Sequence, residues 1–101
     1  GSAQTVIRRG DAALDPVASV LRIGAAEVTL RNRELRLLEL FMNAPGQIFS
    51  KDKLVDRLFS YDGTVTENAI EVYVGRLRKH LEPSTLTIST HRGLGYRLDG
   101  G

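Results

Sequence analysis

Residues 66–97 read TENAIEVYVGRLRKHLEPSTLTISTHRGLGYR, and this stretch predicts a helix, a turn and a β-hairpin in direct succession. On a helical wheel that advances about 100° per residue, residues 66–81 show one narrow apolar stripe with Tyr73 at its edge. The stripe consists of Ile70, Val74, Leu77 and Leu81. The opposite side carries Asn68, Val72, Gly75, Arg76 and Lys79, flanked by Glu71 and Arg78. The helix therefore has one face to bury and one basic, partly apolar face to expose.

The outer face of this helix carries side chains that suit the edges of DNA bases. Arg76 has the bidentate fork that pairs with guanine, Asn68 has the amide that pairs with adenine, and Val72 suits a thymine methyl group. A solvated basic face is the plainer alternative, because charged residues usually lie outside. Two residues favour contact with another surface. Val72 gains nothing from water, and Gly75 in mid-helix costs about 1 kcal/mol relative to alanine.

Residues 86–99 have the alternation of a hairpin. Leu86, Ile88 and Thr90 alternate with polar residues, and the return strand continues the pattern. Gly93 and Gly95 permit the backbone angles of a tight connection, which places Arg92 at or beside an exposed tip. An arginine on a narrow ribbon suits the minor groove or a phosphate. Taken alone, the segment also fits an ordinary hairpin with a solubilising arginine.

Basic residues gather on these two elements. The whole chain has a net charge of only +2 at pH 7, which by itself does not indicate nucleic acid. Between Gly75 and Arg97, however, five basic residues face the single acid Glu82. The five are Arg76, Arg78, Lys79, Arg92 and Arg97. Such a local patch attracts phosphate regardless of sequence.

Upstream of the helix, shorter elements are predicted. Four strands, at residues 5–9, 12–15, 20–23 and 27–30, are punctuated by Gly10, Pro16 and Gly24. A helix over residues 32–43 is apolar on several sides and is therefore expected to be sandwiched between the sheet and later helices. Ser50 is a suitable N-cap for a helix ending near residue 59. Residues 60–65 form a loop, and a capping-box pattern from Thr64 to Glu67 marks the start of the basic helix.

Composition limits the class of protein. A chain of 101 residues with 42% hydrophobic content makes one compact domain. The absence of cysteine excludes disulfides and thiolate metal sites. No apolar run approaches the roughly 20 residues of a membrane span, and the start lacks a signal peptide, so a soluble, cytoplasmic domain is expected. Gly1-Ser2 has the sequence of a tag remnant, which leaves residues 3–101 as one domain excised from a longer protein.

The chain resembles the C-terminal effector domain of OmpR/PhoB-type response regulators over nearly its whole length. The resemblance rests on Leu30, Glu34-Leu35-Arg36-Leu37-Leu38, Ser50-Lys51, Leu54, the block from Val72 to Lys79 and the block from Thr90 to Arg97. It implies an α+β winged helix-turn-helix fold with an N-terminal four-stranded antiparallel sheet, three helices and a C-terminal β-hairpin wing. The order of elements read from periodicity agrees with that fold.

The resemblance also implies sequence-specific binding of double-stranded promoter DNA by a bacterial transcription regulator of a two-component phosphorelay. The third helix would enter the major groove and the wing would meet the minor groove. The candidate DNA-binding residues are Asn68, Val72, Tyr73, Gly75, Arg76, Arg78, Lys79, Thr90, Arg92, Gly93 and Tyr96. The implied partners are a receiver domain absent from this chain, a cognate sensor kinase, a second copy on DNA, and RNA polymerase at the loop Ser60, Tyr61, Asp62, Gly63 and Thr64.

Two departures from the family pattern bear on the site. Asn68 and Gly75 occupy outward positions at which relatives often carry basic residues, so base preference and phosphate affinity are expected to differ. Arg31 stands where a threonine cap is common, and Asn32 is expected to take over capping.

Other functional classes are less well supported. The two histidines, His80 and His91, lie on separate basic segments without triad partners or a ligand set, and His80 is expected to be a solvated helix residue. We therefore expect neither an enzyme nor a metal or cofactor site. The serious alternative is a winged helix whose basic face docks an acidic protein partner.

Overall fold

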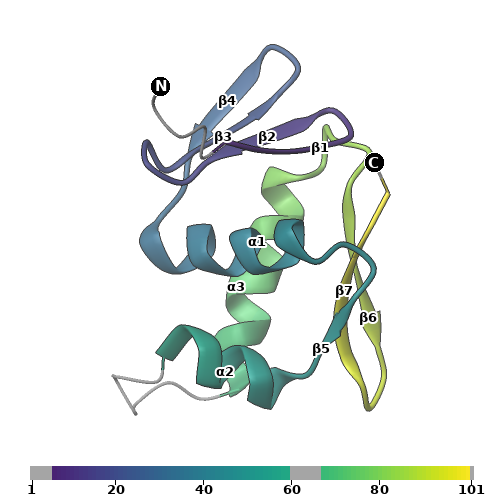
Figure 1. The fold of residues 1–101 in the computed structure, drawn as a ribbon. Helices are drawn as coiled ribbons and strands as arrows, with labels where there is room; N and C mark the ends of the chain where they lie inside the picture. The colour runs from purple at the N-terminus through teal and green to yellow at the C-terminus, as the bar shows by residue number, and fades with distance from the viewer. Residues whose placement is uncertain (1–5, 60–66, 101) are drawn as a thin grey trace.

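The computed structural model describes residues 6–59 and 67–100, and its elements follow the order predicted from the sequence, with one additional short strand. Four strands form one sheet at the N-terminal end, three helices lie beneath it, and a second sheet stands beside the helices (Figure 1). Both layers and the sheet at the side share one hydrophobic core. The predicted winged-helix architecture is confirmed. Among the described helices, none has the length and apolar character needed to cross a membrane.

The N-terminal sheet is a meander of short antiparallel strands. It comprises β1 (Ile7–Arg9), β2 (Ala12–Asp15), β3 (Val20–Ile23) and β4 (Ala26–Thr29), paired in that order. Alternation places Leu14 and Leu21 opposite each other and fully buried against the helices. The predicted fourth strand is displaced by one residue, because Leu30 leaves the ladder and turns into the core. Its N–H donates to the Ser19 carbonyl at 2.7 Å.

Helix α1 (Asn32–Asn43) lies in the centre of the molecule, in contact with β1, α2, α3 and β7. Leu37, Leu38 and Phe41 are fully buried on it, which confirms the sandwiched position expected from its several apolar sides. The expected cap is wrong: Arg31 is the N-cap residue, no side-chain hydrogen bond caps the helix there, and Asn32 is the first helical residue.

A short strand that the sequence did not predict extends the C-terminal hairpin. Strand β5 (Ile48–Phe49) pairs with β7 (Gly95–Asp99), whose other edge pairs with β6 (Thr87–His91). The predicted two-stranded hairpin is therefore part of a three-stranded sheet. The Phe49 ring meets the Phe41 ring edge-on, at 5.6 Å between centroids and 83° between planes. This contact ties the part of the wing next to its turn to α1, since Phe49 pairs with Tyr96.

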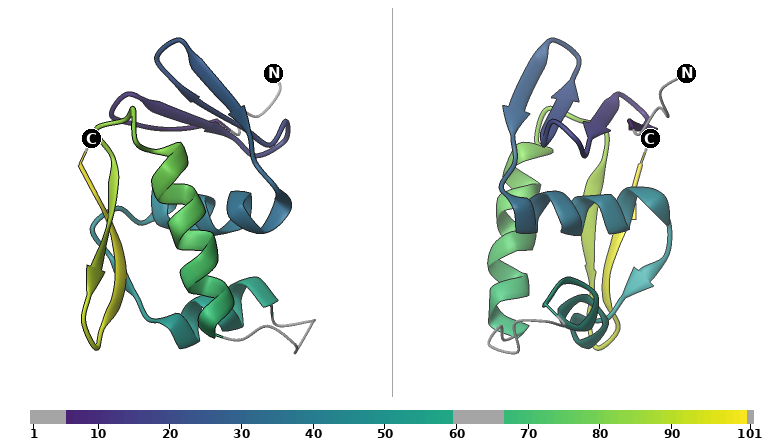
Figure 2. Two further views of the ribbon diagram at one scale, coloured as in Figure 1. Left: turned by 180° about the vertical axis from the view of Figure 1, so that it is seen from behind. Right: turned by 60° about the vertical axis from the view of Figure 1, so that its left-hand side comes forward.

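Helices α2 (Lys51–Phe59) and α3 (Glu67–His80) complete the helix-turn-helix. Ser50 caps α2 as predicted, since its Oγ accepts the Lys53 N–H at 3.1 Å. The predicted stripe of α3 is buried, with Ile70, Val74, Leu77 and Leu81 each at most 2% exposed. Seen from behind, α3 is the foremost helix, and the second sheet stands at its side (Figure 2). The predicted loop at residues 60–65 and the capping residue Thr64 lie outside the described residues.

Candidate nucleic-acid interface

The outer face of α3 is open, as its wheel predicted. Val72 is 53% exposed, and Asn68, Gly75, Arg76 and Lys79 are exposed as well. Around Gly75, a Cβ atom would meet nothing within 4 Å. The face therefore has an apolar methyl group and a gap in the middle, with polar and basic groups around them. The open space at Gly75 leaves room for the edge of a base pair to approach the helix.

One flank of α3 is fastened to the wing by Arg78. Its Nε donates to the Ile88 carbonyl at 2.9 Å, and its Nη2 donates to Thr90 Oγ1 at 2.5 Å. The guanidinium also lies 5.9 Å from the centroid of the Tyr96 ring. Because β6 is an edge strand, Arg78 uses a carbonyl that the sheet leaves unpaired. Arg78 and Thr90 therefore set the position of the wing relative to the helix, in addition to any contact they make with DNA.

The same flank carries a second link, from α3 to α2. The Lys51 ammonium lies 2.6 Å from the Glu71 carboxylate. This pair places an acid and a base of compensating charge between the helix and the wing. The Lys51–Glu71 pair also lines an open groove of about 330 Å³ under the wing, together with residues 90–96.

The other flank of α3 meets α1. The Arg33 guanidinium donates to the Tyr73 hydroxyl at 3.2 Å, and His80 Nε2 lies 3.7 Å from Glu34 Oε1. Glu34 is only 3% exposed, and the His80 side chain is 28% exposed. The expectation that His80 is simply solvated is therefore wrong, because it covers a buried carboxylate. The partner is 46 residues away in sequence, which is why helical periodicity gave no sign of it.

The wing tip is a tight turn that presents Arg92 and Leu94 outward. Leu94 N–H donates to the His91 carbonyl at 2.9 Å, and Gly93 takes a φ of +75°. Both flanking side chains are exposed, Leu94 to 61%. Arg92 is thus placed at the tip as predicted. Leu94 is not among the predicted DNA-binding residues, although it is a large apolar side chain exposed close to Arg92.

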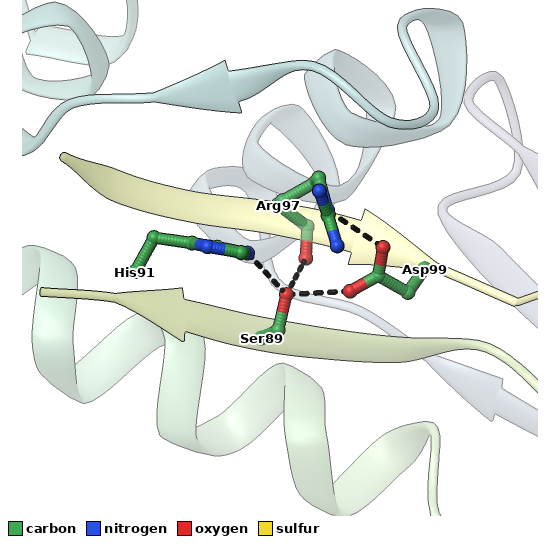
Figure 3. A network of polar contacts seen from close by, with 4 residues as sticks. All are labelled: Ser89, His91, Arg97 and Asp99. Atoms are coloured by element: carbon green, nitrogen blue, oxygen red, sulfur yellow. Dashed lines mark hydrogen bonds and ion pairs between the residues drawn. The ribbon is translucent and has the colours of Figure 1, made fainter.

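The outer face of the hairpin carries a polar network of four side chains (Figure 3). Arg97 Nε lies 2.7 Å from Asp99 Oδ1, and Ser89 Oγ donates to Asp99 Oδ2 at 2.5 Å. The Ser89 hydrogen bond, followed by Arg97, lowers the pKa of Asp99, so the carboxylate is ionised at neutral pH. Its charge therefore compensates that of Arg97. Asp99 lies two residues beyond the segment from Gly75 to Arg97 in which five basic residues face one acid.

This network contains a serine, a histidine and an aspartate, but it does not have the geometry of a catalytic triad. His91 Nε2 lies 3.0 Å from Ser89 Oγ, whereas the Asp99 carboxylate contacts the serine and not the imidazole. A triad needs the carboxylate on the histidine, so that the ring is oriented to take the serine proton. Here the serine hydroxyl donates its hydrogen bond to the Asp99 carboxylate, so in the contact with Ser89 Oγ it is His91 Nε2 that donates. The arrangement braces the hairpin.

The remaining predicted residues differ in how far they can reach a ligand. Tyr96 is 5% exposed and packs inward, and Tyr73 is half-buried beneath Arg76, whose guanidinium lies 5.9 Å from its ring centroid. Both rings support arginines. The predicted polymerase-contact residues Ser60 to Thr64 lie outside the described residues.

The basic cluster therefore divides into engaged and available cations. Arg78 and Arg97 have protein partners. Within residues 67–100, Arg76, Lys79 and Arg92 have no hydrogen bond or ion pair to another side chain. These three lie on the outer face of α3 and at the wing tip. An unpaired cation keeps its full field for an approaching anion, so these positions mark the electrostatic centre of the face.

Gly75 provides a test of whether this face approaches another surface. Gly75→Ala should raise the free energy of unfolding by about 1 kcal/mol, because alanine is the better helix former and its Cβ meets no atom. If DNA backbone or a base edge comes close there, the same methyl group lowers duplex affinity. We expect stability and affinity to change in opposite directions, as measured by urea unfolding and by fluorescence anisotropy. Unchanged affinity would show that the gap is not part of the interface.

A helix-turn-helix followed by a hairpin with a cationic tip defines a winged-helix DNA-binding domain. The family described as "Transcriptional regulatory protein, C terminal" matches residues 25–98. The chain belongs to this family of output domains of transcription regulators. It is 41% identical to the phosphate regulon transcriptional regulatory protein PhoB of Rhizobium meliloti over 94% of its own length and 43% of that protein. It is 35% identical to the transcriptional regulatory protein QseB of Escherichia coli O157:H7, over 97% of this chain and 44% of that protein.

Solved structures have the same fold. The DNA-binding domain of E. coli CadC superposes with a TM-score of 0.87 at 28% identity, covering 99% of this chain and 96% of that one. The C-terminal domain of the nisin resistance regulator NsrR, a lantibiotic response regulator, gives a TM-score of 0.77 at 30% identity, with 91% and 94% covered. The chain spans less than half of the curated relatives it matches, which are 43% and 44% covered.

Proposed function

We propose that this domain binds promoter DNA sequence-specifically, with α3 in the major groove and the wing in the adjacent minor groove. The observation that supports this proposal most directly is that some cations of the basic cluster have protein partners and others do not. Arg76, Lys79 and Arg92 are exposed, without a side-chain hydrogen bond or ion pair among the described residues, while Arg78 and Arg97 are bound by other protein groups. A helix about 10–12 Å across fits a major groove about 12 Å wide. The basic outer face of the helix then brings hydrogen-bond donors to the base edges.

Within this binding mode, the side chains have different roles. Arg76, Asn68 and Val72 face the base edges, whereas Lys79 and Arg92 hold phosphate or the minor groove. Arg78, Thr90, Tyr73 and Tyr96 act mainly by fixing the helix, the wing and Arg76. This division follows from their partners and burial.

The wider context is also proposed. The relatives named as transcriptional regulators, together with the response regulator NsrR, support an output domain that a receiver domain and a sensor kinase control in the bacterial cytoplasm. One helix reads only a few base pairs, so we expect two copies on adjacent half-sites, about one helical turn apart. The segment at residues 60–64 is proposed to contact RNA polymerase.

A salt titration with duplex DNA tests the binding mode. Each cation that neutralises a phosphate should release counterions, so log affinity should fall against log salt with a slope of about −0.9 per phosphate held. We expect a steep slope for specific and random duplexes alike, measured by fluorescence anisotropy. A flat response, or no binding to any duplex at low salt, would favour the alternative that the basic face docks an acidic protein partner.

A further inference from the structure

A cationic pocket lies beside the C-terminal half of α3, on the side away from the wing. It is an open hollow of about 330 Å³, lined by Thr29, Arg31, Glu34, Arg76, Lys79 and His80. Two of its three permanent cations come from α3. The third, Arg31, comes from the connection between β4 and α1. Arg31 was not among the predicted DNA-binding residues.

The cations of this pocket are available. Within the described residues, Arg31 and Lys79 have no side-chain hydrogen bond or ion pair, and Arg31 does not cap α1 although it occupies the N-cap position. The one acid, Glu34, has a side chain only 4% exposed and faces His80 at 3.7 Å. The lining therefore carries three permanent cations against this one acid, and its net charge is positive.

The place of the pocket relative to the wing suggests its ligand. Arg78 and Glu71 mark the flank of α3 that meets the wing and α2, whereas His80 and Tyr73 mark the flank that meets α1. A helix that fills the major groove has a phosphate backbone along each side. The wing lies on one side of α3, so Arg31 lies on the side that faces the other phosphate backbone.

We propose that Arg31 and Lys79 form a binding site for one phosphodiester of the DNA backbone, on the side of the major groove away from the wing. This inference rests on the proposed function. A guanidinium can present two parallel N–H groups to two phosphate oxygens, and an ammonium adds a point charge. Because the group recognised is a phosphate, the site positions the domain on DNA without reading its sequence.

Arg31→Thr tests the site without weakening the fold. Threonine is a good N-cap, so the melting temperature should rise by about 4 °C. Duplex affinity should fall roughly 10-fold at low salt, on specific and random sequences alike, and the salt slope should become shallower by about 0.9. A gain in stability with a loss in affinity cannot come from misfolding.

Arg57→Ala is the matched control. Arg57 is also exposed, but it lines a different hollow, between α1 and α2, with Arg36, Leu40 and Leu58. Its removal takes away the same charge from outside the pocket. We expect the salt slope to stay the same. The affinity should change less than 2-fold, because the charge of Arg57 acts on DNA only at long range, where salt screens it.

A scan with single neutral methylphosphonates along a duplex selected for tight binding then locates the contact. The wild-type domain should lose about 10-fold at one backbone position, and Arg31→Thr should lose nothing further there. Two results would contradict the phosphate site while leaving DNA binding intact. One is an Arg31→Thr variant with the wild-type salt slope. The other is an Arg31→Thr variant whose affinity falls as much as that of the wild type at every methylphosphonate position. If the wild-type domain binds no duplex at low salt, both the site and the proposed function are wrong.

Discussion

Gly95→Ala is expected to destabilise the domain by about 3 kcal/mol or more, the largest effect of any single methyl group at the wing. Gly95 begins β7 with a φ of +137°, and a Cβ there would lie 2.0 Å from the Phe49 carbonyl oxygen and 2.5 Å from its carbon. Both atoms are backbone of β5, so no rotamer change can relieve the contact. Phe49 in turn is held by its edge-on packing on Phe41.

The affinity for DNA should fall together with stability, since the start of β7 can no longer pair with β5. Gly93→Ala is the matched control. Gly93 also has a positive φ, +75°, but a Cβ there meets nothing within 4 Å. Its cost should be only the left-handed backbone penalty of about 1–2 kcal/mol. Urea unfolding of both variants measures the difference. Equal losses would mean that the contact with Phe49 carries no energy and that the close approach of β5 and β7 is not rigid.

The parts of this fold that the sequence predicted are those specified by neighbouring residues. The stripe of α3, the cap on α2 and the alternation of β6 each depend on residues a few positions apart. The two-residue strand β5 was missed, because two residues show no alternation and its formation depends on β7, almost fifty residues later. The constraint on Gly95 comes from the same remote pairing.

The candidate site shows the same limit. The sequence placed Arg78 and Arg97 in one basic cluster with Arg76 and Lys79, because charge can be counted along a chain but partners cannot. Only the fold shows that Arg78 donates to Ile88 and that Arg97 is paired with Asp99. In the sequence Arg31 is only a departure from the common threonine cap, since its proximity to α3 depends on how α1 crosses that helix.

Among substitutions on the outer face of α3, Arg76→Ala is expected to reduce the sequence specificity of DNA binding the most. Arg76 stands on the outer face of α3 with its guanidinium 5.9 Å from the centroid of the Tyr73 ring, a cation–π contact that stabilises this position of the side chain. Loss of a bidentate contact should cost about 1–3 kcal/mol on the preferred site and relax the preference at one base pair. Binding-site selection from random duplexes, followed by anisotropy on the selected and a scrambled site, measures both.

Two further variants separate reading from simple attraction. Lys79→Ala removes a charge from the same face without a fork, so specific and scrambled duplexes should weaken by the same factor. Arg76→Lys keeps the charge and loses the planar pair of donors. It should therefore bind the scrambled duplex as the wild type does, but discriminate as poorly as Arg76→Ala. Discrimination retained by Arg76→Lys would show that Arg76 supplies only a positive charge. The reading of bases would then fall to Asn68 and Val72, which also lie on the open face of α3.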